Sequence, residues 1–255
     1  MSKINKILAK WLSGDVHTLR WFERHGVSQR VAYGYSKSGA LRKIGPGVFS
    51  LPDDKLDWRG AVRALQEELL APVHVGGRSA LELQGVAHNI AGAMRPRISI
   101  IATGRVAVPT WIKDNDWNAD LIFQQLSLFS SDGSFTDLTN NGLTIKLSSR
   151  EQAILELIDA LDLSETFETA ENYLSSLMTM RPSELQKLLE RCTSFKVKRV
   201  FLYLAERLEL PFFSKLKLGS IDIGSGKRVV VKGGHWNAKY MITVPKEESE
   251  ASLGF

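Results

Sequence analysis

Short apolar stretches with helical spacing fill the first forty residues of the chain. In "INKILAKWL" the apolar residues recur every three or four positions, which predicts a helix over residues 2–13. The same spacing predicts a second helix over residues 19–25 and a third over residues 28–38. Ser28 suits the N-cap of the third helix, and Gly39 suits its C-terminal stop.

The segment after the third helix predicts a β-hairpin. Its two apolar runs, "ALRKIG" and "VFSL", flank a turn that contains Gly45, Pro46 and Gly47. Helix, helix, short turn, helix and hairpin follow one another in a winged helix-turn-helix. The polar segment "PDDKLD" comes next, and we place a domain boundary there, so that residues 1–52 form one domain and residues 53–255 another.

The second domain mixes helical and strand patterns. Helical spacing in "WRGAVRALQEELL" and "RSALELQG" flanks the short strand "PVHVGG", and three β-rich runs follow, interrupted by a polar loop at residues 110–119. Ser149 and Gln152 give the start of another helix the capping-box form. The predicted fold class is therefore α+β, an N-terminal winged helix-turn-helix followed by a larger mixed α/β domain. Further helices are predicted at residues 166–180, 182–192 and 196–208, followed by two strands joined at "GGHWN".

The formal net charge of +5 is a property of the N-terminal domain. Residues 1–52 carry nine Lys and Arg against Asp15 and Glu23, which gives +7, whereas residues 53–255 carry 24 basic and 26 acidic residues and net −2. A small basic module of this kind is typical of a domain that binds a polyanion.

The third predicted helix is the candidate reader of DNA, because the corresponding helix of a helix-turn-helix lies in the major groove. If Val31 and Tyr35 face the interior, the outer face of this helix carries Gln29, Arg30, Tyr33 and Lys37. Arg pairs with guanine and Gln with adenine through two hydrogen bonds each, while Lys and a tyrosine hydroxyl suit phosphates. Arg42 and Lys43 lie on the predicted hairpin, the wing, where they would touch the DNA backbone or the minor groove. The predicted DNA-binding residues are Gln29, Arg30, Tyr33, Lys37, Arg42 and Lys43.

Two alternatives remain for this basic module. It could be a solvated basic face, or a winged helix that is used for protein contacts. The charge of +7 over residues 1–52 favours DNA over both.

No catalytic, metal or cofactor site is predicted. The histidines are scattered, the patterns H-E-x-x-H and G-x-S-x-G are absent from the sequence, and Cys192 has no neighbouring base. The glycines of "HVGGRSALELQG" could hold a phosphate, but the segment lacks the spacing of a phosphate-binding loop and favours a tight turn. Asp114, Asp116 and Asp120 would have to converge on a metal for the alternative function, a nucleic-acid-processing enzyme with a winged-helix targeting module. Three acidic residues in a polar loop more often bind no metal and simply belong to an exposed loop.

A second basic set lies on the helices predicted between residues 182 and 208. A solvated helix face is the simpler interpretation, and a surface for a polyanion or an acidic partner is the alternative. The set consists of Lys187, Arg191, Lys196, Lys198 and Arg199.

The sequence predicts a cytoplasmic protein. Its N-terminal segment has no continuous hydrophobic run and no small-residue cleavage site, and no stretch approaches the roughly 20 apolar residues of a membrane span. The single cysteine cannot form an internal disulfide.

Several segments, in their order along the chain, resemble a known family. These are "YSKSGALRKIGPGVFSLP", "HVGGRSALELQGVAH", "FKVKRVFLYLAERLELPFF", "GKRVVVKGG" and "YMITVP". Together they are similar to the AbiEi antitoxins of bacterial type IV toxin–antitoxin systems, and the resemblance spans nearly the whole chain.

The resemblance implies two activities. The N-terminal winged helix-turn-helix would repress its own operon at inverted repeats in double-stranded DNA, and the C-terminal domain would counter a nucleotidyltransferase-like toxin encoded alongside. Members of the family are usually classed as acting without a stable complex with the toxin, so a direct contact is not implied. The DNA contacts of the family correspond to Gln29, Arg30, Tyr33, Lys37 and Lys43, and its basic antitoxin positions to Lys196, Lys198 and Arg199.

Overall fold

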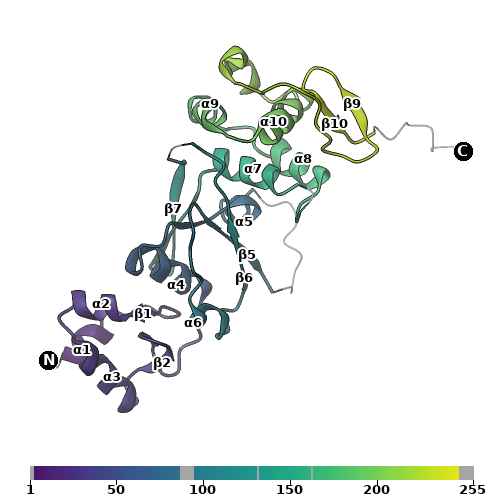
Figure 1. The fold of residues 1–255 in the computed structure, drawn as a ribbon. Coiled ribbons are helices and arrows are strands. Elements are labelled where there is room, and N and C mark those ends of the chain that lie inside the picture. Colours follow the sequence, from purple (N-terminus) through teal and green to yellow (C-terminus); the bar gives the residue numbers. More distant parts are fainter. Residues whose placement is uncertain (1–2, 87–94, 131, 162, 247–255) are drawn as a thin grey trace, which may run out of the picture. The chain divides into compact units, whose positions relative to one another are not determined.

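The computed structural model describes residues 3–86, 95–130, 132–161 and 163–246 (Figure 1). Its elements gather into two compact units. The first unit takes its described residues from 3–79, 95–127 and 135–147, and the second from 80–86, 128–134 and 148–246. The chain therefore passes from one unit to the other more than once.

The first unit begins with three helices and a small sheet. Its three strands pair in the antiparallel order β1-β3-β2, with His17 opposite Phe49. The order of these elements is the one expected of a winged helix-turn-helix, in which β2 and β3 would be the wing, and we use the name wing for this hairpin. The elements are α1 (Lys3–Leu8), β1 (His17–Thr18), α2 (Leu19–Arg24), α3 (Gln29–Lys37), β2 (Arg42–Gly45) and β3 (Val48–Ser50).

The first helix is shorter than predicted. It ends at Leu8, because the amides of Lys10 and Trp11 bond to carbonyls three residues back rather than four, and so tighten the chain into a turn. The turn buries the Trp11 ring against Phe22, with the ring centroids 6.0 Å apart. The apolar spacing beyond Leu8 therefore marks core positions without a helix.

The buried side of α3 differs from the prediction. Ala32 is fully buried, whereas Val31 is 39% exposed, so the expectation that Val31 faces the interior is wrong. Tyr35 is half-buried and packs against the core, as expected. The small Ala32 side chain lets α3 lie close to the hairpin, where Phe49 fills the core between α2 and α3.

A five-stranded mixed sheet forms the rest of the first unit. Its strand order is β6-β5-β4-β8-β7, with β4 antiparallel to β5 and parallel to β8, and β5 parallel to β6. Gly76, just after β4, donates its amide to the Ser99 carbonyl, and Gly77 begins α5 (Gly77–Leu83), so the two glycines join the strand directly to the helix rather than through a separate turn. The elements are α4 (Trp58–Arg63), the π-helix η1 (Ala64–Glu68), β4 (Val73–Val75), β5 (Arg97–Ala102), α6 (Thr110–Lys113), β6 (Asp120–Gln125), β7 (Phe135–Asn140) and β8 (Leu143–Ser148).

The second unit is mainly helical (Figure 1). Eight of the ten residues of α7 are buried, because α8, α9 and α10 all pack around it. The Ser149 hydroxyl accepts from the amide of Gln152 at 3.3 Å, which confirms the predicted N-terminal cap. The helices are α5 (Gly77–Leu83), within which the chain enters this unit, α7 (Arg150–Asp159), α8 (Phe167–Ser175), α9 (Pro182–Arg191), α10 (Phe195–Arg207) and the short 3-10 turns η2 (Phe213–Lys215) and η3 (Leu218–Ser220).

The C-terminal strands pair differently from the prediction. The segment expected to be the turn contains β9 (His235–Asn237), which pairs antiparallel with β10 (Ile242–Val244). The other edge of β10 is taken by residues 228–231, since the Arg228 amide donates to the Met241 carbonyl at 3.0 Å and the Thr243 amide to the Arg228 carbonyl at 3.1 Å. The described helices include none that is both long and apolar enough to cross a membrane.

Candidate nucleic-acid interface

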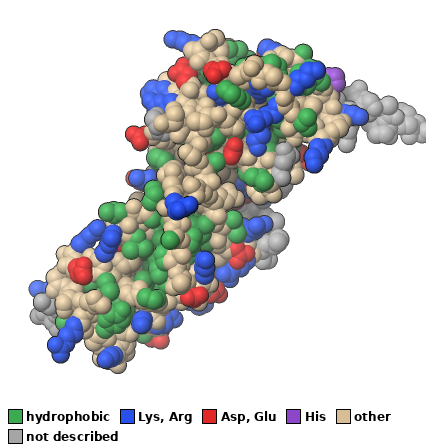
Figure 2. All heavy atoms as spheres, viewed as in Figure 1, with side chains coloured by type: hydrophobic (Ala, Val, Ile, Leu, Met, Phe, Trp, Pro, Cys, Tyr) green, Lys and Arg blue, Asp and Glu red, His purple; other side chains and the backbone are tan. Residues whose placement is uncertain are grey.

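The outer face of α3 carries exposed side chains one and two turns apart. Arg30, Gly34 and Lys37 are all exposed, and their spacing places them on one side of the helix. Gln29 is exposed in the first turn. Figure 2 shows Lys and Arg side chains at the end of the molecule that Figure 1 labels α1 and α3. We define the outer face of α3 by Gln29, Arg30, Gly34 and Lys37.

Tyr33 lies at the border of this face rather than at its centre. It is half-buried, and its ring packs edge-on against Phe49 with the centroids 5.4 Å apart. The Lys43 ammonium of the wing lies 5.5 Å from the same ring, over its face. Tyr33 therefore joins α3 to the wing and positions Lys43 beside the outer face.

The two predicted wing residues differ in their surroundings. Arg42 donates from Nε to the Ser50 hydroxyl at 3.0 Å and from Nη2 to the Asp54 carbonyl at 2.9 Å, so its guanidinium is bonded to the base of the hairpin. Lys43 is exposed, with its ammonium over the Tyr33 ring. Of the two, Lys43 has the side chain better placed to reach a ligand.

Two of the basic side chains in residues 1–52 form hydrogen bonds to backbone carbonyls within the first unit. Arg20 donates to the carbonyls of Glu68 and Leu69 at 3.4 Å, and Arg24 donates to the Glu67 carbonyl at 3.1 Å. These carbonyls close the C-terminal end of η1, where a helix dipole favours cations. The charge of +7 therefore overstates what residues 1–52 offer to a polyanion.

The wing is held from behind by α6, which sequence analysis placed in a loop. Asn115 donates from Nδ2 to the carbonyls of Ile44, at 2.9 Å, and Trp111, at 2.8 Å. At Gly45 a Cβ would lie 2.5 Å from Cβ of Trp111, so this position accepts no side chain without moving α6. The sequence pattern did not predict this contact, because α6 has only four residues and the strand that it contacts, β2, lies about seventy residues earlier in the chain.

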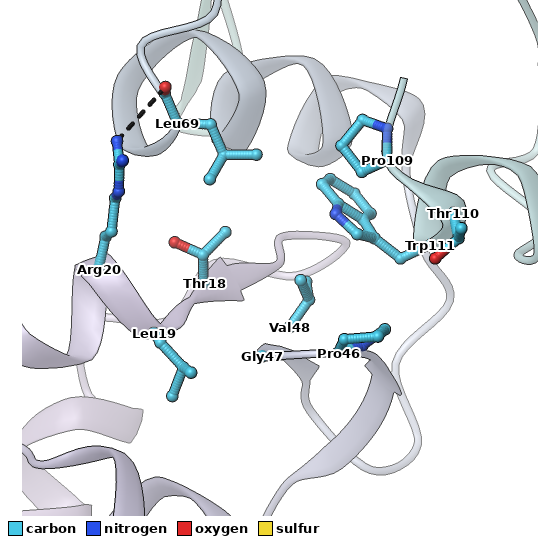
Figure 3. A pocket seen from close by; sticks show the side chains of 10 residues that line it. All are labelled: Thr18, Leu19, Arg20, Pro46, Gly47, Val48, Leu69, Pro109, Thr110 and Trp111. Atoms are coloured by element: carbon cyan, nitrogen blue, oxygen red, sulfur yellow. Dashed lines mark hydrogen bonds between the residues drawn. The ribbon is translucent and has the colours of Figure 1, made fainter. Parts of the chain in front are cut away.

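A shallow cavity of about 330 Å³ opens beside this contact (Figure 3). Leu19, Val48 and Trp111 contribute apolar walls, and Arg20 stands at the rim with its bond to the Leu69 carbonyl. The lining has no carboxylate, amide or histidine side chain, so it offers a ligand few polar anchors.

A buried charged cluster ties β1 to α4 and η1. Arg63 donates from Nε to Asp15 Oδ1 and from Nη2 to Glu68 Oε1, both at 2.8 Å. The Thr18 amide donates to Glu68 Oε2 at 2.6 Å, and Nδ1 of His17 lies 2.7 Å from Glu68 Oε1. We call Asp15, His17, Arg63 and Glu68 the buried charged cluster; each is less than a tenth exposed.

The two carboxylates of this cluster shift in opposite directions. Burial raises the pKa of Asp15, and the positive charge of Arg63 offsets this only in part. Burial alone would also raise the pKa of Glu68, but the hydrogen bond from His17 and the charges around it outweigh burial and lower that pKa. The cluster is a structural anchor between residues 15–18 and residues 63–68.

The acidic residues that could have formed a metal site have another partner. Arg95 binds Asp116 from Nη2 and Asp120 from Nε, both at 2.8 Å, and these bonds lower the pKa of Asp116. Asp114 ends α6 as its C-cap. Among the described residues, no group of three or more His, Cys, Asp or Glu side chains could hold a metal ion.

The basic set of the second unit is largely not a surface. Lys198 and Arg199 are 3% and 1% exposed, so the expectation that they belong to an antitoxin surface is wrong. Arg199 is buried because backbone carbonyls of the loop after η3 accept its N–H groups. The half-buried Lys196 donates to the Asp159 carbonyl at 2.7 Å.

The remaining members of that set lie on α9 and are exposed. Lys187 pairs with Glu184 at 2.9 Å, and Arg191 donates to the Asp132 carbonyl at 3.5 Å. The nearby Cys192 is buried, which raises the pKa of its thiol to about 11 and leaves it protonated at neutral pH.

Comparison with solved structures identifies proteins of similar fold. The protein RV2827C from Mycobacterium tuberculosis, known from its crystal structure, superposes with a TM-score of 0.57 over 89% of this chain and 85% of that one. The two sequences are 13% identical, so the likeness concerns the fold alone. No curated protein sequence matches the chain significantly.

Two family models together match most of the sequence. The model for the N-terminal domain of AbiEi antitoxin transcriptional regulators matches residues 1–92. The model for the AbiEi antitoxin, a transcriptional regulator of type IV toxin–antitoxin systems, matches residues 95–245. Together with the α+β fold, these matches show that the chain belongs to the AbiEi family of antitoxins and transcriptional regulators of type IV toxin–antitoxin systems.

Proposed function

We propose that the chain represses its own promoter by binding inverted repeats in double-stranded DNA, and that it counters a nucleotidyltransferase-like toxin. We assign the first activity to residues 1–52 and the second to residues 53–255. The observation that carries the DNA-binding proposal is the outer face of α3, where Arg30, Gly34 and Lys37 share one exposed side with Lys43 beside them.

Each side chain of this interface has a distinct role in the proposal. Arg30 pairs with a guanine edge in the major groove, and Gln29 suits an adenine. Lys37 and Lys43 bind phosphates and set the register of the helix on the duplex. The exposed Val31, which the sequence pattern assigned to the core, suits contact with a thymine methyl group.

We expect Arg30→Ala to erode sequence preference. The loss should be about 1–3 kcal/mol of discrimination, because a bidentate contact to guanine is removed while the phosphate contacts remain. Fluorescence anisotropy with the chain's own upstream DNA and with a scrambled duplex, each at two salt concentrations, measures it.

Lys43→Ala is the matched control for Arg30→Ala. It removes one positive charge from the wing and should weaken both duplexes by the same factor, with a shallower salt dependence. Equal affinity of the unmodified chain for both duplexes would contradict the repressor proposal.

A glycine in the outer face gives an independent test. Gly34→Ala should raise the free energy of unfolding by about 0.5–1 kcal/mol, because alanine favours the helix and, apart from the adjacent residues and the backbone of α3 itself, no described atom lies within 4 Å of the new methyl group. If α3 lies in the major groove, the same methyl group enters the interface and lowers DNA affinity. Thermal unfolding and anisotropy should therefore change in opposite directions; unchanged affinity would mean that DNA does not approach Gly34.

The antitoxin half of the proposal is tested in cells. Expression of the toxin gene adjoining this one should arrest growth, and co-expression of this chain should restore it. Restoration by the Arg30→Ala variant would assign neutralisation to residues outside the outer face of α3. Growth arrest that this chain does not relieve would contradict its role as the antitoxin.

A further inference from the structure

A second basic segment lies at the end of the second unit. Residues 195–246 contain eleven Lys and Arg against Glu206, Glu209 and Asp222, a larger excess than that of residues 1–52. The net charge of −2 over residues 53–255 conceals it, because the preceding residues 53–194 are acidic and Glu247, Glu248 and Glu250 follow in the sequence. Figure 2 shows basic side chains gathered over the region that Figure 1 labels α10, β9 and β10.

The strand β10 organises this segment into a small platform. Trp236 of β9 lies opposite Thr243 on one edge of β10, and residues 228–231 lie along the other edge. The Thr243 hydroxyl accepts from the amides of Val230 and Val231 at 2.9 and 3.0 Å. These bonds fix the backbone from which the side chains of residues 227–236 project.

The surface of this platform alternates basic and apolar groups. The Lys227 ammonium lies 5.4 Å from the Trp236 ring centroid, over its face. Arg228, Lys232 and His235 are exposed, and Val229 between them is 68% exposed. We define the platform surface by Lys227, Arg228, Val229, Lys232, His235 and Trp236. Of these, Lys227 contacts the Trp236 ring, whereas Arg228 pairs with Ile242 and so leaves its strand on the face opposite to Trp236, which pairs with Thr243.

Among the described residues, Glu206 is engaged by partners outside the platform surface. Glu206 binds the Lys239 ammonium and accepts from the Tyr240 hydroxyl at 3.0 Å. Burial lowers the pKa of Arg199, and the positive charge of Arg228 lowers it further.

We propose that the platform surface binds single-stranded nucleic acid, with one base stacked on Trp236, the neighbouring phosphates bound by Lys227 and Lys232, and Arg228 adding positive charge from the other face. Aromatic rings between basic side chains bind single strands, because every base has a face that stacks while the backbone carries a regular negative charge. Residues 227–246, which form the platform, consist of short strands and loops and contain no helix that could enter a major groove. In a duplex the base faces are already stacked and do not reach Trp236.

The test uses the full chain and labelled RNA and DNA oligonucleotides of one sequence, about 15 nucleotides long, at about 50 mM salt. The double variant Lys227→Glu/Arg228→Glu should raise the Kd for the single strand at least about tenfold. Trp236→Leu should raise it roughly 5- to 100-fold, the range for loss of one stacked base. Tighter binding of RNA than of DNA would identify contacts to the 2′-hydroxyl and hence RNA as the natural ligand; equal binding would identify backbone and base stacking alone.

The control is Lys187→Glu/Arg191→Glu, which makes the same charge change on α9 and should leave the Kd within about twofold. Absence of single-strand binding by the unmodified chain would overturn the proposal, as would an equal loss in the control. A fall in affinity for the promoter duplex in Lys227→Glu/Arg228→Glu, without loss of single-strand affinity, would also overturn it. Arg30→Ala should weaken only the duplex, so failure here is distinguishable from failure of the repressor proposal.

Discussion

Replacement of Arg63 by alanine is expected to destabilise the first unit by about 3–5 kcal/mol, the usual cost of removing one partner from a buried ion pair. Arg63 is the cation between Asp15 and Glu68, and its bonds of 2.8 Å to each carboxylate have no substitute within the buried charged cluster. Without Arg63, two carboxylates remain buried beside His17. Chemical denaturation followed by circular dichroism measures the loss.

The loss of stability caused by Arg63→Ala should become smaller as the pH falls. Removing the cation raises the pKa of both carboxyl groups in the folded variant above their values in the unfolded chain, and a raised carboxyl pKa lowers stability at neutral pH. As the pH falls from 7 toward 5, the carboxyl groups protonate in the folded variant and the deficit relative to the unmodified chain should shrink.

Arg30→Ala serves as the control for this experiment, because Arg30 is exposed and should change the free energy of unfolding by no more than about 0.5 kcal/mol. A deficit for Arg63→Ala below about 1 kcal/mol would contradict the structural role assigned to the cluster. So would a deficit that grows on acidification.

The second large effect concerns Arg199. Arg199→Ala should destabilise the second unit by about 3 kcal/mol, because charged hydrogen bonds are lost and the carbonyls they served stay partly buried. Nε donates to the Ile223 carbonyl and Nη1 to the Gly226 carbonyl, both at 2.7 Å, and Nη2 donates to the Ser225 carbonyl at 3.1 Å. Hydrogen exchange should increase across residues 223–231, which these bonds hold to α10.

Arg228→Ala provides the comparison for Arg199→Ala. Arg228 is exposed and opposes the charge of Arg199, so its removal should leave stability unchanged or slightly raised. Equal losses in the two variants would contradict the distinction between a buried anchor and a surface residue. If Arg199→Ala loses toxin neutralisation, the loss is explained by unfolding of the second unit. If Arg228→Ala loses it, the loss is explained by removal of a side chain of the platform surface.

Capping residues and helical spacing in the sequence predicted the helices α3 and α7. Ser28 and Ser149 lie at the N-caps of α3 and α7, and the exposed positions of Arg30 and Lys37 follow from helical spacing once α3 is placed. Spacing alone did not choose between Val31 and Ala32 for the interior, because α3 presents the smaller side chain to the hairpin.

Elements defined by distant partners were not predictable in the same way. β1 has two residues and exists because residues 48–49 pair with it, and β7 is an edge strand without alternating burial. Arg199 has the spacing of a basic helix face, and only the fold brings the carbonyls of residues 223–226 to it. The partners of Arg42 and Asn115 were likewise invisible to local pattern.

The contact between the wing and α6 has a consequence for how such proteins diversify. Gly45 and Ile44 meet Trp111 and Asn115, so the shape of the wing depends on a segment encoded about seventy codons downstream. Recombination that exchanges residues 1–52 between two family members would separate the wing from its support. Residues 1–52 are therefore not an interchangeable cassette, and if they bind DNA as proposed, new operator preferences should arise by paired substitutions in both segments.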